Sequence, residues 1–161
     1  MRLEALYRAR FSAAHSWSAE LTGDGGTEGQ NFLITEGRCE GQIAASWRGA
    51  NYPRRRTDCT LTPDFRGVLE TDDGATILFA CRGYLRTGAS GTRELVGSMT
   101  HITDDQRYLR LNDAYCAVAG EVRHRPEQSP AGVVLDIYEL VWQPLASSRR
   151  TAGARGGQRA W

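Results

Sequence analysis

The sequence lacks most of the short motifs that mark familiar enzyme classes. It contains no GxSxG elbow, no P-loop and no GxGxxG segment that opens a helix after a strand. Hydrolases with a covalent nucleophile, kinases and nicotinamide enzymes are therefore disfavoured. The four cysteines include no CxxC pair, and the three histidines have neither HxH nor HxxxH spacing. We expect no metal site and no cofactor, because the ligand spacings and binding motifs that they require are missing.

Strong charge and long hydrophobic runs are also missing. The formal net charge is +1, which creates no field that would attract nucleic acid. No apolar run approaches the length of a membrane span, and the first residues have neither the apolar core nor the cleavage site of a signal peptide. We therefore expect a cytoplasmic protein that binds neither nucleic acid nor membranes and keeps its cysteines as free, mostly buried thiols.

Proline is scarce, whereas glycine is abundant. The 161 residues include five prolines and eighteen glycines, a composition typical of many turns and bulges rather than long helices. Apolar residues alternate with mainly charged ones from Leu3 to Phe11, as they do in a half-buried strand. The same alternation predicts strands over residues 3–11, 28–36, 39–48, 64–72, 75–83, 94–103, 114–123 and 132–143.

About eight strands with short connections predict an all-β fold, a closed antiparallel barrel with a pocket-sized interior. We expect a loop over residues 12–27, a hairpin turn near Gly37, and one short helical turn over residues 104–112 with Thr103 or Asp104 as its N-cap. Residues 1–145 are assigned to the barrel domain. The small, basic residues 146–161 are assigned to a flexible tail.

The clearest local signal is the Asp73-Gly74 pair between two alternating strands. Such a pair predicts a two-residue type I′ hairpin, in which Asp72 lies opposite Ala75. Neither face of this hairpin is purely apolar, so the pattern leaves open which one points inward, and we favour the face on which Val68, Ile77, Phe79 and Cys81 form an apolar wall. The predicted register places these six side chains on it: Asp64, Arg66, Val68, Ile77, Phe79 and Cys81.

Several stretches resemble a known family. Residues 64–75 are similar to its D-x-R-x-x-L-x-T-D-D-G-A pattern, and Arg82-Gly83 follows at the family spacing. Residues 108–112 and 133–139 resemble its Y-x-x-L-N turn and its closing strand. On these motifs the chain resembles the small β-barrel family catalogued as domain of unknown function 3237. The resemblance implies a lipocalin-like antiparallel barrel and, as in some members, a cofactor-free cyclase or isomerase of secondary-metabolite biosynthesis.

Three positions depart from the family pattern. Gly67 and Ala80 stand where larger side chains are usual, which either widens the pocket or adjusts the packing. His101 stands where an aromatic side chain is usual, and it introduces a group that can titrate near neutral pH.

Asp64, Arg66 and His101 are the candidate catalytic residues. A lumenal carboxylate beside a guanidinium would anchor a polar substrate group or act as an acid or base, but the same pair could simply close one end of the barrel. His101 is either an acid or base in the lumen or a core histidine with satisfied hydrogen bonds. The candidate substrate-binding residues are Trp47, Asn51, Tyr52, Phe79, Tyr115 and Tyr138.

Two functions fit these observations, both with a hydrophobic small molecule as the partner. The first is a cofactor-free cyclase or isomerase that combines a shaped pocket with acid/base catalysis. The alternative is a binding or carrier barrel without turnover. A homo-oligomer formed through edge strands is a third, weaker hypothesis.

Overall fold

The computed structural model describes residues 1–88, 92–125 and 128–144 of the chain. One 3-10 helix, η1, spans Leu109–Asp113. The strands are β1 (Arg2–Gly23), β2 (Gly26–Gly41), β3 (Ala45–Asn51), β4 (Arg54–Arg55), β5 (Leu61–Thr62), β6 (Asp64–Thr71), β7 (Thr76–Thr87), β8 (Arg93–Ile102), β9 (Cys116–Arg125) and β10 (Gln128–Val141).

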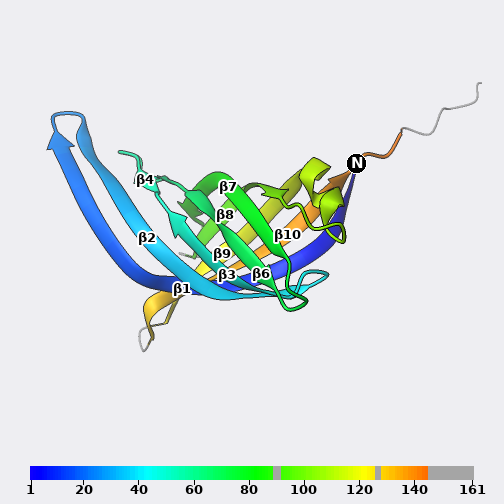
Figure 1. Cartoon of the computed structure of the whole chain (residues 1–161). Helices are drawn as coiled ribbons and strands as arrows, with labels where there is room; N and C mark the ends of the chain where they lie inside the picture. The colour runs from blue at the N-terminus through cyan, green and yellow to red at the C-terminus, as the bar shows by residue number, and fades with distance from the viewer. Residues whose placement is uncertain (89–91, 126–127, 145–161) are drawn as a thin grey trace, which may run out of the picture.

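Eight of these strands close into an antiparallel ring. Each pairs with the next in the order β1, β10, β9, β8, β7, β6, β3 and β2, and β2 pairs back with β1. The short strands β4 and β5 form a second bridge between β2 and β7 (Figure 1). The predicted all-β barrel is therefore confirmed. The predicted tail, residues 146–161, lies outside the described residues.

The first two strands are longer than the alternation predicts. β1 and β2 stay paired as far as Gly23 and Gly26, so most of residues 12–27 form strand rather than loop. Figure 1 shows this part of the hairpin extending beyond the ring. Gly37 lies inside β2, opposite Phe11, and not in a turn. A Cβ at Gly37 would lie 2.5 Å from the Cβ of Phe11, so this glycine permits close packing of that side chain.

The helical turn begins later than predicted. Its N-cap is Tyr108, whereas Thr103 directly follows the end of β8 and receives the Asn112 side chain. The Asn112 amide accepts from the backbone N–H of Thr103 at 2.8 Å and donates to its carbonyl at 2.9 Å. These bonds hold η1 against the end of β8, where Leu111 is buried.

The hairpin between β6 and β7 has a three-residue loop instead of the predicted two-residue turn. Thr71 pairs with Ala75, donating its backbone N–H to the Ala75 carbonyl at 2.9 Å. Gly74 has a φ of +90° and is the one loop residue in the left-handed region, as in a type I turn followed by a glycine bulge. The extra residue puts Leu69, not Glu70, opposite Ile77. Because side chains alternate between faces, this shift of one residue reverses the face of β6.

The barrel core is packed around Trp47, which is fully buried. Its ring stacks on Phe11 with centroids 4.6 Å apart and contacts Phe79 at 4.1 Å. Gly67 lies opposite Phe79, and a Cβ there would lie 2.7 Å from the tip of the Phe79 ring. The ring occupies the space that a side chain at Gly67 would need, so this departure from the family pattern changes the packing and does not widen the lumen.

Candidate functional site: a cavity at one end of the barrel

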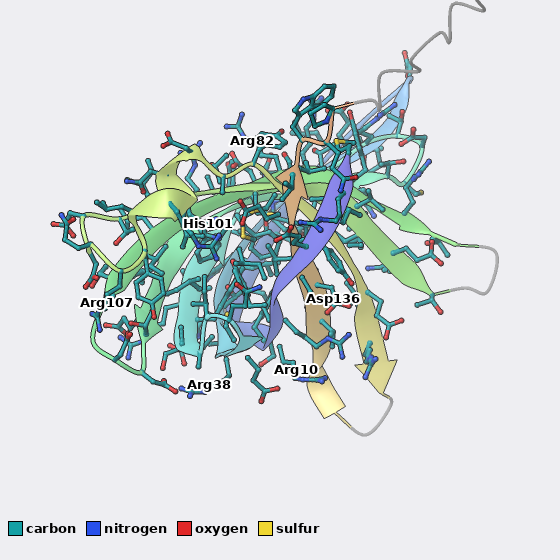
Figure 2. All side chains as sticks on the ribbon, turned by 90° about the vertical axis from the view of Figure 1, so that its right-hand side faces the viewer. Arg10, Arg38, Arg82, His101, Arg107 and Asp136 are labelled. Atoms are coloured by element: carbon teal, nitrogen blue, oxygen red, sulfur yellow. The ribbon has the colours of Figure 1, made fainter. Side chains whose placement is uncertain are left out.

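Asp64 and Arg66 lie on the outside of the barrel, which corrects their predicted position in the lumen. Their side chains are 37% and 65% exposed, and Asp64 Oδ1 lies 3.6 Å from Arg66 Nε and 3.4 Å from Arg82 Nε. The three-residue loop explains the error, because it turns Phe65 and Leu69 inward instead. Figure 2 shows Arg82 at the outer surface and His101 inside the ring.

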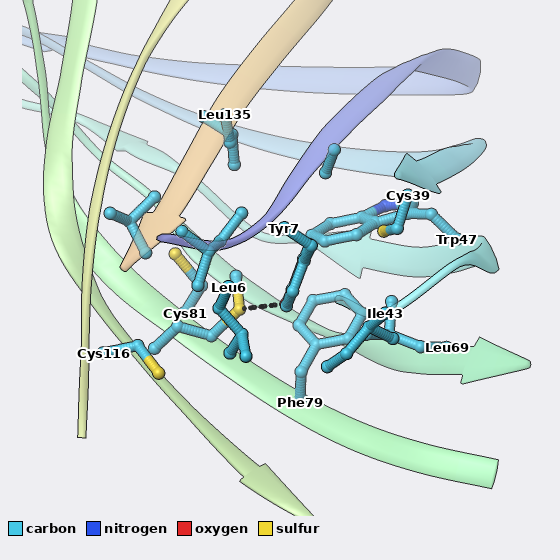
Figure 3. Packing of buried hydrophobic residues seen from close by; sticks show 14 of the residues in the cluster. Leu6, Tyr7, Cys39, Ile43, Trp47, Leu69, Phe79, Cys81, Cys116 and Leu135 are labelled. Atoms are coloured by element: carbon cyan, nitrogen blue, oxygen red, sulfur yellow. Dashed lines mark hydrogen bonds between the residues drawn. The ribbon is translucent and has the colours of Figure 1, made fainter. Parts of the chain in front are cut away.

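His101 does face the lumen, at the end of the barrel covered by η1, which we call the packed end. It is 1% exposed, and its Nε2 lies 2.8 Å from the Tyr7 hydroxyl. The same hydroxyl donates to the Met99 sulfur at 2.9 Å, the bond drawn in Figure 3. Burial lowers the pKa of His101 to about 4 and raises that of Tyr7 well above its usual value. Both groups are therefore neutral at pH 7.

The opposite end of the barrel contains a cavity of about 280 Å³, which we call the lumen cavity. Its apolar wall is formed by Phe11, Leu33, Leu61, Phe65, Leu85, Leu95, Val122 and Val133. Its volume is near the lower end of the range of about 300–1,000 Å³ that is usual for small-molecule sites. Arg93 and His101 are eight residues apart on β8, about 27 Å of extended strand. His101 does not line the lumen cavity.

A few polar groups line the lumen cavity. The Thr35 hydroxyl already has hydrogen-bond partners within the protein, because it donates to the Gly49 carbonyl and accepts from the Trp47 indole. Asn51 at the end of β3 is 5% exposed and accepts from the backbone N–H of Asp64. Arg93 at the start of β8 is the one charged side chain among the described residues of the lining.

Of the six candidate binding residues, Asn51 lines the lumen cavity and the other five do not. Trp47 and Phe79 are inside the barrel but belong to its packed aromatic core (Figure 3). Tyr52 and Tyr115 are 56% and 55% exposed. Tyr138 is half-buried and lines a groove on the outer surface.

Arg93 is the charged residue of the site that the sequence analysis missed, although a signal for it exists. Leu95 and His101 are buried on the same face of β8, and counting back by two from Leu95 gives Arg93. Arg93 is itself an exposed residue at the start of a strand, so the alternation alone gives no sign that it borders a cavity. Only the closure of the ring shows that this position lies at the edge of a cavity.

A larger hollow of about 660 Å³ lies on the outer surface over β7 and β8. Its lining includes Tyr84 and Val96 on the outer face of these strands, together with Tyr52, Arg54 and Asp64. The lumen cavity is the better candidate site, because strands surround it and can keep a ligand away from water.

Two further properties of the described residues concern metals and membranes. No three histidine, cysteine, aspartate or glutamate side chains among them lie close enough to hold a metal ion. No helix in the described part of the chain has the length and the apolar content to cross a membrane.

Comparison with known proteins agrees with the fold. The model of the family described as "Protein of unknown function (DUF3237)" matches residues 1–140. The chain belongs to this family. No curated protein matches the sequence.

Several solved structures share the fold at low sequence identity. A β-barrel-like protein from Acinetobacter baumannii AYE is 22% identical, with a TM-score of 0.71 over 86% of this chain and 94% of that one. A protein of unknown function from Clostridium acetobutylicum is 14% identical, with a TM-score of 0.71 over 86% and 96%. A protein from Penicillium herquei described as an enzyme is 18% identical, with a TM-score of 0.61 over 86% and 92%.

Proposed function

We propose that this DUF3237 protein binds a hydrophobic small molecule in the lumen cavity and promotes its cyclisation or isomerisation without a cofactor. The observation that carries the proposal is the cavity itself, a space of about 280 Å³ at the open end of the barrel with apolar walls and a few polar groups. This combination is typical of small-molecule sites, in which apolar surface supplies affinity and sparse polar groups fix orientation.

Confinement is the main contribution that such a site can make to a ring closure. A flexible substrate held with its reacting atoms close together avoids much of the entropic cost of reaching the transition state, an effect worth up to about 7–11 kcal/mol in well-oriented intramolecular reactions. A rearrangement, or a ring closure by intramolecular addition to a double bond, also leaves the atomic composition unchanged, so it needs neither a redox cofactor nor a second substrate. The protein from Penicillium herquei that is described as an enzyme shares this fold, which adds support for catalysis on it.

A carrier without turnover is the second candidate, and one observation favours it. Among the described residues that line the lumen cavity, none has a side chain that titrates near neutral pH. Acid/base catalysis by Asp64 or His101 is not supported, because one lies outside the barrel and the other at its packed end. Catalysis here would rest on positioning and on polar groups that stabilise developing charge.

The test is to incubate the full chain with phenols and 1,3-diketones that carry alkenyl side chains. Turnover would give a product of unchanged mass and altered chromatographic retention. Leu33→Trp should abolish both binding and turnover, because the indole fills the lumen cavity. Ile34→Trp is the matched control, since Ile34 is the next residue of β2 and faces outward. Binding without conversion would favour the carrier, and equal loss in both variants would contradict the lumen as the site.

A further inference from the structure

Arg93 brings a positive charge to an otherwise uncharged cavity. It pairs with Thr87 on β7 and with Val122 on β9, in register with Leu95 on the inner face. No described carboxylate forms a salt bridge with its guanidinium, and no acidic side chain lines the lumen cavity. The site therefore has an excess of positive charge without an internal counter-ion among the described residues.

Asn51 supplies a second, independent hydrogen-bond donor to the same cavity. The backbone N–H of Asp64 can only donate a hydrogen bond. The Asn51 atom that lies 3.1 Å from it is therefore the carbonyl Oδ1, which accepts. The Nδ2 group then points elsewhere and has no partner among the described residues. In the described structure, every side-chain polar atom that is sealed from solvent has a hydrogen-bond partner. Since Nδ2 lacks such a partner, it is accessible to solvent, and the cavity that Asn51 lines provides this access.

The rest of the lining is complementary to an apolar body. Phe11, Phe65, Leu85 and Leu95 present aromatic and aliphatic surface to the same cavity as the two donors. Burying such surface contributes about 25 cal/mol for each Å² removed from water, whereas a guanidinium binds a carboxylate through charge-assisted hydrogen bonds. A ligand that matches both features has an anionic end and one or two apolar rings.

We propose that the lumen cavity selects small apolar carboxylates, with Arg93 binding the anionic group and the Asn51 amide donating to an oxygen of the ligand. This inference rests on the proposed function, because it names the substrate class of the same cavity. Arg93 and Asn51 are thus assigned as specificity-determining residues of the site.

The experiment compares 2-naphthoate with its neutral analogue 2-naphthamide by titration calorimetry at pH 7.5 and low ionic strength. The carboxylate should bind about tenfold more tightly, the lower end expected for a charged hydrogen bond at a partly exposed site. Arg93→Ala and Arg93→Gln should each reduce this preference to less than about twofold. Arg86→Ala is the matched control, because Arg86 lies opposite Glu94 on the outer face at the same end of the barrel. It should keep the full preference.

Asn51→Asp tests the second donor with little change in shape. The new carboxylate still accepts from the backbone N–H of Asp64, but it presents an anion to the cavity where the amide presented a donor. Binding of 2-naphthoate should fall at least tenfold, while 2-naphthamide binding should change much less. Unchanged circular dichroism and melting temperature would show that the barrel remains folded.

The outcomes separate this inference from the proposed function. Equal binding of acid and amide by the native protein would overturn the carboxylate preference and leave the lumen site standing. Failure of both probes to bind would also overturn it, and the alkenyl substrates with Leu33→Trp would then decide the proposed function separately. A preference that survives both Arg93 variants would show that another group holds the anion.

Discussion

The phenolic oxygen of Tyr7 lies 2.8 Å from Nε2 of His101 at the packed end of the barrel. A neutral imidazole satisfies this arrangement, because Nε2–H can donate to the phenol while the phenol donates to the Met99 sulfur. Protonation would place a charge among buried apolar side chains, which explains why burial lowers the pKa of His101 to about 4.

The depressed pKa predicts a specific dependence of stability on pH. The unfolded chain binds a proton at His101 near pH 6.5, whereas the folded chain resists it until about pH 4. The stability from this group is therefore complete above pH 6.5 and declines as the pH falls from 6.5 towards 4. Between pH 7.5 and 4.5 the loss should be about 2 kcal/mol, measured by urea unfolding.

His101→Phe is the variant that isolates this contribution. It restores an aromatic side chain and removes the titrating group, so the native protein should lose about 2 kcal/mol more than the variant over that pH range. The other histidines and the carboxylates are common to both proteins and cancel in the comparison. Parallel stability curves would contradict the lowered pKa, because they would show that His101 binds its proton at the same pH in the folded and unfolded chains.

The cysteines are predicted to differ sharply in reactivity. Burial raises the pKa of Cys39 and Cys81 to about 12 and that of Cys116 to about 11, whereas Cys59 is exposed. Because the thiolate is the reactive form, iodoacetamide at pH 8 should modify one thiol of the folded protein, and peptide mapping should place it at Cys59. In urea all four should react. Rapid modification of Cys116 in the native protein would show that the packed end opens.

Two glycines allow the conformation of the β6–β7 loop to be tested without steric complications. A Cβ at Gly74 or at Gly23 would meet nothing within 4 Å, but Gly74 has a φ of +90° while Gly23 is extended. Gly74→Val should therefore cost more than about 1 kcal/mol, because a β-branched residue resists positive φ. Gly23→Val should lie within about 0.5 kcal/mol of the native protein. Equal melting temperatures for the two variants would contradict the loop geometry.

The sequence was sufficient to predict the barrel because alternation is a local property. Residues 7–11 show their inner and outer faces directly, and strands of this kind in sufficient number close into a ring. The alternation fails before them, because a bulge between Ala5 and Tyr7 leaves Leu3 and Ala5 exposed and buries Leu6. The sequence was not sufficient to predict where the hairpins turn. Gly37 looks like a turn until Phe11 packs over it, and an Asp-Gly pair, although typical of two-residue hairpins, also fits a three-residue loop that ends in a glycine bulge.

The candidate site was harder to predict because it depends on register and on residues from distant strands. One extra loop residue moved Asp64 and Arg66 from the expected inner wall to the surface. Asn51 was identified as a binding candidate, but its donor role depends on the backbone of Asp64, which no sequence pattern reveals. Arg93 can be recognised as a candidate binding residue only in the folded barrel, where β8 and β3 line the same cavity.

The positions of the first catalytic candidates lead to a final prediction. Asp64→Asn should leave turnover within about twofold of the native protein, because its carboxylate pairs with Arg66 and Arg82 outside the barrel. His101→Phe should do the same, since His101 lies about 27 Å along β8 from the level of Arg93. A general acid or base would instead contribute about 10²- to 10⁴-fold. The rate of product formation at saturating substrate is the measurement, with Leu33→Trp as the variant that abolishes activity. If either variant lost 100-fold or more of this rate with ligand binding intact, that residue would take part in catalysis. Such a result would contradict a mechanism based on positioning in the lumen cavity.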